Sequence, residues 1–171
     1  TLAGMSFANA FFGIDHSCGH KLGAYHHLPH GVCVSLMLDE VMKFNAAEAP
    51  TKMVTFPQYK YPNTLRRYAE VAEMLGITGK DDQTKLNKLI AKIDALRKDI
   101  ELPMTIQEAG VKEEDFLATL DEMSEAAFND QCTGTNPRYP LISEIKTIYL
   151  KSYYGEAEYN KKYNKGSKEA K

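Results

Sequence analysis

The sequence has no tryptophan and only three cysteines among its 171 residues. The cysteines stand far apart, at positions 18, 33 and 132, so they form neither a disulfide framework nor a CxxC pair of a structural zinc cluster. A reducing, cytoplasmic setting is therefore expected. A long apolar run is also missing, because the uncharged residues 1–14 are too few to span a bilayer and lack the basic flank of a signal peptide.

The sequence has no strong excess of charge of either sign. Lys and Arg number 21 against 23 Asp and Glu, which gives a formal net charge of -2. Nucleic acids and anionic membranes are normally bound by basic patches, so neither is expected as a partner. The length suits one domain, and 43% hydrophobic with 26% charged residues is typical of a globular protein.

The sequence also lacks the strict polar and apolar alternation of a half-buried strand, and no segment repeats at a fixed period. Apolar residues recur instead at helical spacing, most clearly in the segments 32–45, 63–75, 81–100, 112–128 and 140–155. Gly76 and Gly155 stand where helices are expected to end. We therefore predict an all-α fold of about seven helices.

The composition varies along the chain and indicates how it is divided. Residues 1–14 are apolar on every side, so a helix there needs cover from other protein, and the chain is expected to be a piece of something larger. Residues 46–62 contain three prolines and predict a long connection. We expect one helical metal-binding domain over residues 1–155 and a frayed or disordered charged tail over residues 156–171.

All five histidines lie between positions 16 and 30. A single histidine is more often a packing or surface residue than a ligand, but such a cluster favours a metal site. His16 and His20 are four residues apart and share one helix face, and His30 follows Pro29, where the chain can turn back towards them. Imidazoles suit Fe, Zn, Ni or Cu. A zinc hydrolase or lyase stays open, although only Asp15 is near enough in sequence to supply a base.

The histidines belong to a longer pattern, His16-Ser-Cys-Gly-His20-Lys-Leu-Gly23 followed by His27-Leu-Pro29-His30-Gly31. This pattern resembles the metal-binding signature of the iron-containing (group III) alcohol dehydrogenases. The segments 107–111 and 130–144 are similar to the alcohol dehydrogenase half of bifunctional aldehyde-alcohol dehydrogenases, and the resemblance covers about residues 1–155. It departs at Cys18-Gly19, where many relatives have Met-Ala, and Gly19 is expected to weaken the helix.

The resemblance implies that the chain is most of the C-terminal helical domain of a two-domain dehydrogenase. The family's iron has one Asp and three His ligands, and His16 and His30 match the two histidines that this domain supplies. His20 matches a histidine close to the metal, which makes it a candidate catalytic residue, with a packing role as the equal alternative. Phe7 and Cys132 match positions that line the substrate pocket, although Phe7 fits the core equally well.

The implied enzyme is an iron-dependent, NAD-linked alcohol dehydrogenase. It interconverts a primary alcohol such as ethanol and its aldehyde, with Fe²⁺ polarising the substrate oxygen during hydride transfer, and Zn²⁺ is a possible substitute. The sequence has no strand followed by a Gly-rich loop, so NAD is expected mainly in the other domain and the chain alone is expected to be inactive. The full-length protein is expected to form a homo-oligomer or filament. A non-catalytic helical packing or oligomerisation module remains the alternative.

Overall fold

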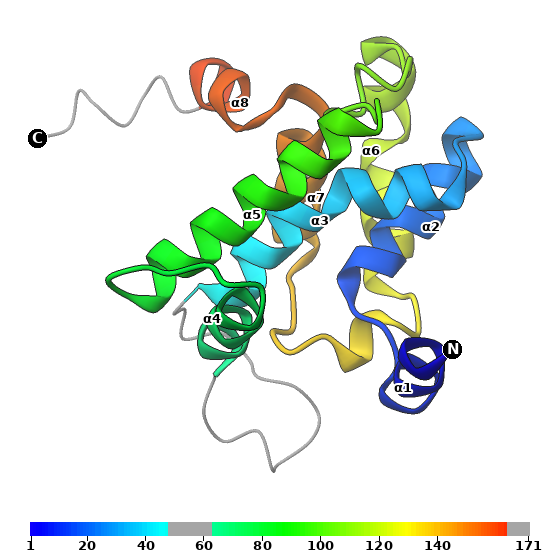
Figure 1. Ribbon diagram of the computed structural model, residues 1–171. Helices are drawn as coiled ribbons and strands as arrows, with labels where there is room; N and C mark the ends of the chain where they lie inside the picture. Colours follow the sequence, from blue (N-terminus) through cyan, green and yellow to red (C-terminus); the bar gives the residue numbers. More distant parts are fainter. Residues whose placement is uncertain (48–62, 164–171) are drawn as a thin grey trace, which may run out of the picture.

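The computed structural model describes residues 1–47 and 63–163, and the elements within these ranges are helices (Figure 1). They are α1 (Leu2–Ala10), α2 (Ile14–His26), α3 (His30–Ala46), α4 (Thr64–Met74), α5 (Asp82–Asp99), α6 (Glu113–Phe128), the short 3₁₀ helix η1 (Thr133–Thr135), α7 (Ile142–Tyr154) and α8 (Glu156–Tyr163). The prediction of an all-α fold is confirmed for the described residues. None of these helices has both the length and the apolar character needed to cross a membrane.

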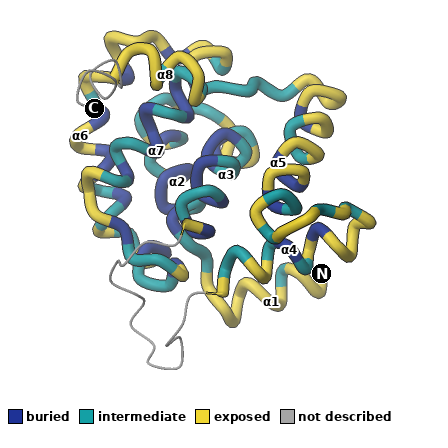
Figure 2. The backbone as a smooth tube through the Cα atoms, turned by 90° about the vertical axis from the view of Figure 1, so that its left-hand side faces the viewer, coloured by how far each residue is buried: buried dark blue, intermediate teal, exposed yellow. Residues whose placement is uncertain are grey.

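Helices α2 and α3 lie at the centre of the molecule, and buried residues are concentrated in these two helices and in α7 (Figure 2). His27 ends α2 in the left-handed conformation with φ 56°, and Pro29 precedes the first residue of α3. The two helices pack closely at Gly19, because a Cβ atom there would lie 2.9 Å from Cγ1 of Val34. The glycine that was expected only to weaken α2 therefore allows α3 to approach it.

Two tyrosines of α7 tie the outer helices to this centre. Both are fully buried, and the hydroxyl of Tyr149 donates a 2.9 Å hydrogen bond to the carbonyl of Cys18 in α2. The hydroxyl of Tyr153 donates to the carbonyl of Val111 at 2.9 Å, and its ring stacks on Phe116 of α6 with centroids 4.3 Å apart. Buried hydroxyl groups need such partners, so these bonds fix how α6 and α7 cover α2.

Helices α4 and α5 form a second, smaller unit that packs on the far end of α3. Gly76 ends the α4 segment with φ 74°, and Asp81 caps α5 by accepting a 2.7 Å hydrogen bond from the amide of Thr84. The buried side chain of Arg97 donates to Oδ2 of Asp39 at 2.9 Å and so holds α5 against α3. The helix end expected at Gly76 is confirmed, and α5 begins next to position 81, where the segment 81–100 predicted a helix.

Helix α8 corrects the sequence analysis, which assigned residues 156–171 to a frayed tail. Residues 156–163 are helical, because Glu156 pairs with Lys43 of α3 at 2.7 Å and with Lys151 of α7 at 3.7 Å, and Tyr159 packs partly against the core. A helix of eight residues is not stable on its own, so the local sequence does not predict it without the contacts to distant segments. Residues 164–171 of the expected tail and 48–62 of the expected connection lie outside the described part, and α3 extends to Ala46.

Removing the charge of Glu156 is expected to loosen α8. The hydrogen bond from Lys43 lowers the pKa of Glu156 from its ordinary value of 4.5, so the contact stabilises the fold above about pH 4.5 and is lost as the pH falls further. Glu156→Gln should remove this stabilisation at neutral pH, by less than about 1 kcal/mol because the pair is partly exposed. Hydrogen exchange of the α8 amides measures it. Glu158→Gln is the control, since Glu158 pairs only with Lys161 of α8 among the described partners, and equal protection in both variants would contradict the assignment.

Helix α1 is apolar, as expected, and none of its residues is buried among the described residues (Figure 2). Leu2 is 82% exposed and Met5 60%, and the adjoining Phe11 is 64% exposed. Apolar side chains gathered at this density normally meet another protein surface. The α1 surface is therefore a place where further protein would pack.

Candidate metal centre

The fold brings three of the five histidines together. His16 and His20 lie on consecutive turns of α2, and His30 is the first residue of α3. The ring centroids of His16 and His30 are 5.4 Å apart, those of His20 and His30 5.3 Å, and those of His16 and His20 5.8 Å. The turn at residues 27–29 thus returns His30 to the helical pair.

The spacing of His16 and His30 fits one shared metal ion. Two imidazoles that each bind an ion at about 2.1 Å place their ring centroids about 5 Å apart, close to the observed 5.4 Å. Burial first, and then the neighbouring His30 and His20, lower the pKa of His16. A lowered pKa keeps the imidazole neutral, which is the form that binds metals. The pair can therefore supply two ligands, and a complete site needs others.

Phe12 holds the ring of His16 and was not singled out by the sequence analysis. The two rings stack with centroids 3.8 Å apart and planes inclined by 19°. The ring of Phe7 packs on that of Phe12, with centroids 4.5 Å apart. Phe7 is 46% exposed, so the structure does not place it in the core of the described chain. Phe11 and Phe12 are equivalent in sequence, and only the fold shows which one faces the histidine.

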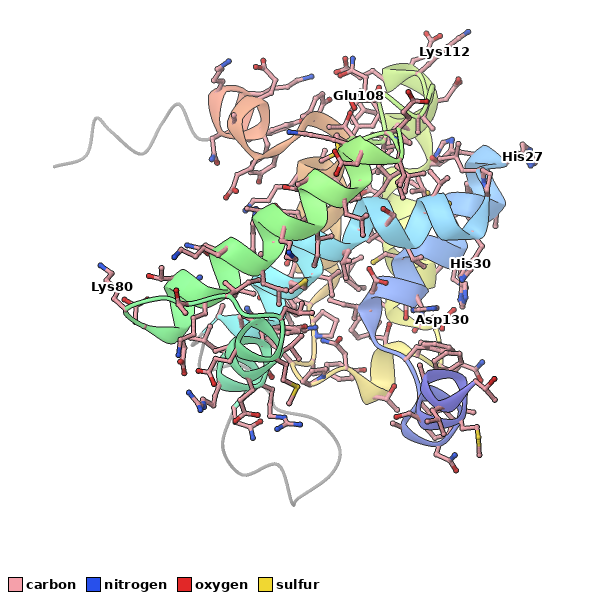
Figure 3. The ribbon with its side chains drawn as sticks, in the orientation of Figure 1. His27, His30, Lys80, Glu108, Lys112 and Asp130 are labelled. Carbon is pink, nitrogen blue, oxygen red and sulfur yellow. The ribbon has the colours of Figure 1, made fainter. Side chains whose placement is uncertain are left out.

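Cys132 and His20 meet at the carboxylate of Asp130, whose side chain is labelled in Figure 3. Oδ1 of Asp130 accepts a 2.9 Å hydrogen bond from the amide of Cys132, and Oδ2 lies 2.9 Å from Nζ of Lys21 and 3.9 Å from Nδ1 of His20. Burial raises the pKa of Asp130, but the hydrogen bonds from Lys21 and Cys132 outweigh it and leave the pKa below its usual value. The sequence analysis gave Asp130 no role, although it opens the loop just before Cys132.

Asn136 fastens the loop of residues 130–140 to the start of α2. Its side chain is 1% exposed, and its Oδ1 accepts from the amide of Ile14 at 3.2 Å and from Nδ2 of Asn45 at 3.3 Å. Its Nδ2 donates to Oδ1 of Asn45 at 2.7 Å. Gly13 leaves room for this side chain, because a Cβ there would lie 2.5 Å from Oδ1 of Asn136. The loop of residues 130–140 thereby positions the start of α2.

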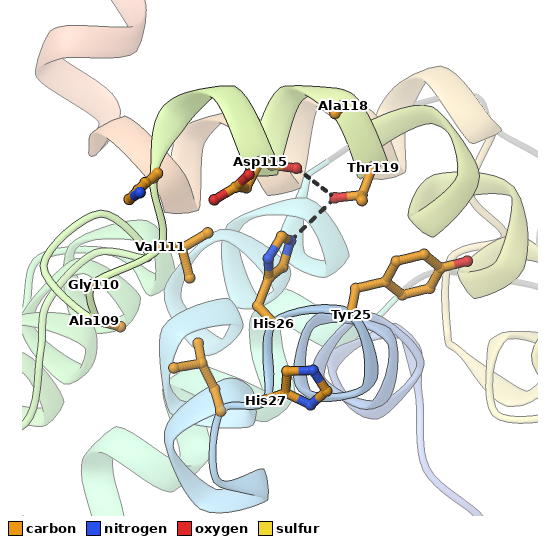
Figure 4. Close-up of a pocket in the computed structure, with 11 residues that line it drawn as sticks. Tyr25, His26, His27, Ala109, Gly110, Val111, Asp115, Ala118 and Thr119 are labelled. Carbon is orange, nitrogen blue, oxygen red and sulfur yellow. Dashed lines mark hydrogen bonds between the residues drawn. The ribbon is translucent and has the colours of Figure 1, made fainter.

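A hollow of about 480 Å³ lies at the other end of α2 (Figure 4). His26 and His27 line it, together with Thr119 of α6. Oγ1 of Thr119 lies 3.1 Å from Nε2 of His26, with which it forms a hydrogen bond, and 3.0 Å from the carbonyl oxygen of Asp115. This hydrogen bond packs α2 on α6. In Figure 3 His27 points away from His30 and Asp130. His16, His20 and His30 are not among the residues that line the hollow, so it is separate from the histidine cluster.

Comparison with known proteins identifies the family. The sequence profile described as "Fe-containing alcohol dehydrogenase family, C-terminal" matches residues 1–153. The chain belongs to the iron-containing alcohol dehydrogenase family. The resemblance of the histidine pattern is thereby confirmed, and the chain corresponds to the C-terminal helical domain of these dehydrogenases.

Relatives within the iron-containing alcohol dehydrogenases include bifunctional enzymes. The chain is 52% identical over 157 residues to the bifunctional aldehyde-alcohol dehydrogenase AdhE of Escherichia coli K12, covering 91% of this chain and 18% of that protein. It is 48% identical over 153 residues to the aldehyde-alcohol dehydrogenase of Clostridium acetobutylicum, covering 90% and 18%. The iron-containing alcohol dehydrogenase structure from Thermococcus thioreducens superposes with a TM-score of 0.72 at 33% identity, covering 91% and 35%. The chain therefore spans less than a fifth of these bifunctional relatives.

Proposed function

We propose that this chain is the metal-binding helical part of an NAD-dependent alcohol dehydrogenase that interconverts a primary alcohol such as ethanol and its aldehyde. The observation that carries the proposal is the meeting of His16 and His30, whose rings are 5.4 Å apart in a chain of this family. The relatives named above are alcohol dehydrogenases, which supports an oxidoreductase. The zinc hydrolase or lyase has no comparable support.

In the proposed enzyme His16 and His30 would hold Fe²⁺, with Zn²⁺ as the alternative. The bound ion would supply a Lewis acid that lowers the pKa of the alcohol hydroxyl. His20, beside the pair, would accept the hydroxyl proton in oxidation and return it in reduction. Phe7 and Cys132 would form walls of the substrate pocket, and NAD, held mainly by the remainder of the enzyme, would carry the hydride.

The exposed α1 supports self-association or domain packing as a second role. Leu2, Met5 and Phe11 present apolar side chains that no described residue covers. We propose that the full-length protein uses such surfaces within a homo-oligomer or filament. This role is compatible with catalysis, and loss of assembly without loss of turnover in Met5→Ser would assign the surface to assembly alone.

Removal of the metal tests the catalytic proposal directly. Chelation of the full-length enzyme is expected to abolish alcohol oxidation, because two ligand imidazoles without an ion cannot activate the hydroxyl. Turnover should return when Fe²⁺ is added back, as measured by NADH absorbance. Restoration by Zn²⁺ alone would change the metal assignment. Full activity of the metal-free enzyme would refute the proposed function.

A further inference from the structure

Three potential ligand atoms converge beside the His16–His30 pair. A ring nitrogen of His20, a carboxylate oxygen of Asp130 and Sγ of Cys132 all lie within 4.8 Å of one another. Ligands of one Zn²⁺ ion stand about 3.3–3.8 Å apart, so side-chain shifts of about 1 Å would close the triangle. Asp130 and Cys132 are nearly buried and His20 is 41% exposed, which leaves an entrance on the His20 side.

The carboxylate of this group already binds a cation. Nζ of Lys21 lies 2.9 Å from Oδ2 of Asp130, and the hydrogen bond from Lys21 helps to keep the carboxyl ionised. Lys21 is attached through a flexible four-carbon stem and is 26% exposed, so its ammonium can leave for solvent. A divalent ion bound by His20, Asp130 and Cys132 would then replace the Lys21 ammonium, which is bound by Asp130.

We propose that His20, Asp130 and Cys132 form a second metal site, separate from His16 and His30, for a thiophilic divalent cation such as Zn²⁺, Co²⁺ or Cd²⁺. Thiolate and imidazole donors select such ions over Mg²⁺ and Ca²⁺, which prefer oxygen ligands. The Cys132 thiol releases one proton to solvent as the sulfur–metal bond forms, and Lys21 leaves with its proton.

Occupation of this second site is expected to inhibit the enzyme. The ion would engage the His20 nitrogen and draw Cys132 inwards, so that neither could serve the substrate. This consequence rests on the proposed dehydrogenase function, whereas binding of the ion does not.

Titration of the full-length enzyme with Co²⁺ tests the proposal, with the near-ultraviolet band of thiolate-bound Co²⁺ as the signal. The band should be present in the wild type and absent in Cys132→Ser, and the difference spectrum removes the contribution of other cysteines. Asp130→Asn should weaken binding by about tenfold or more. Cys33→Ser is the matched control, because Cys33 is fully buried and its thiol donates to the carbonyl of Leu28.

A variant that binds Co²⁺ more tightly than the wild type gives a further test, because a misfolded variant would not gain affinity. Lys21→Met removes the competing ammonium and should tighten Co²⁺ binding by about fivefold. An equal band in wild type and Cys132→Ser, or no band at millimolar Co²⁺, would overturn the second site. An enzyme with the Cys132 band but without alcohol oxidation under any metal would keep the second site and refute the proposed function, so the two failures are distinguishable.

Discussion

Replacing His30 by alanine in the full-length enzyme is expected to remove the bound metal and to lower kcat by about three orders of magnitude or more. A Lewis acid contributes several kcal/mol to the stabilisation of the transition state, and each 1.4 kcal/mol is about tenfold in rate. The ring centroids of His30 and His16 are 5.4 Å apart. His30 is one of the two ligands that we propose this chain supplies to the ion. Metal content and ethanol oxidation should be measured on the same samples, and His16→Ala should behave alike.

His27→Ala is the matched control for this experiment. His27 is also an imidazole of the same turn, but it is exposed and points away from the cluster (Figure 3). The control enzyme should keep its metal and its activity. A fully active His30→Ala enzyme with normal metal content would refute the assignment of His30 as a ligand.

Replacing Asn136 by alanine is expected to destabilise the fold by about 2–5 kcal/mol. The change removes the hydrogen bonds that Asn136 makes to the buried amide of Ile14 and to the side chain of Asn45, and each polar group left unsatisfied costs about 1–3 kcal/mol. Chemical denaturation followed by circular dichroism measures the free energy of unfolding. Because Asn136 connects the Cys132 loop to α2, the variant should also bind its metal less tightly.

Asn129→Ala controls for the loss of an asparagine in the same region. Asn129 is exposed at the end of α6, where its backbone amide donates to the carbonyl of Glu125. It should change the stability by less than about 0.5 kcal/mol. If both variants unfold at the same denaturant concentration, the network around Asn136 does not hold the loop.

Most helices could be predicted from the sequence because their apolar stripes repeat at the helical period. The segments 63–75, 81–100 and 112–128 correspond to α4, α5 and α6 within a few residues. Helix α8 was missed because its stability comes from Lys43 and Lys151, which belong to other helices. Short helices of this kind depend on tertiary contacts rather than on their own pattern.

The candidate site was predictable only in part. The clustering of histidines and the family pattern singled out His16, His20 and His30, since all three lie within fifteen residues of sequence. Their roles stay predictions. Asp130 is more than a hundred residues from Lys21, and no local pattern indicates that their charged groups lie 2.9 Å apart.

The sequence by itself determined the helical class, the family and the three histidines, because these depend on local periodicity and on a contiguous motif. Only the tertiary structure decided that Phe12 stacks on His16, that Asp130 joins His20 to Cys132, and that residues 156–163 are helical. Each of these depends on distances between segments that are remote in the chain. Such distances are set by how buried side chains pack, which is a property of the whole fold.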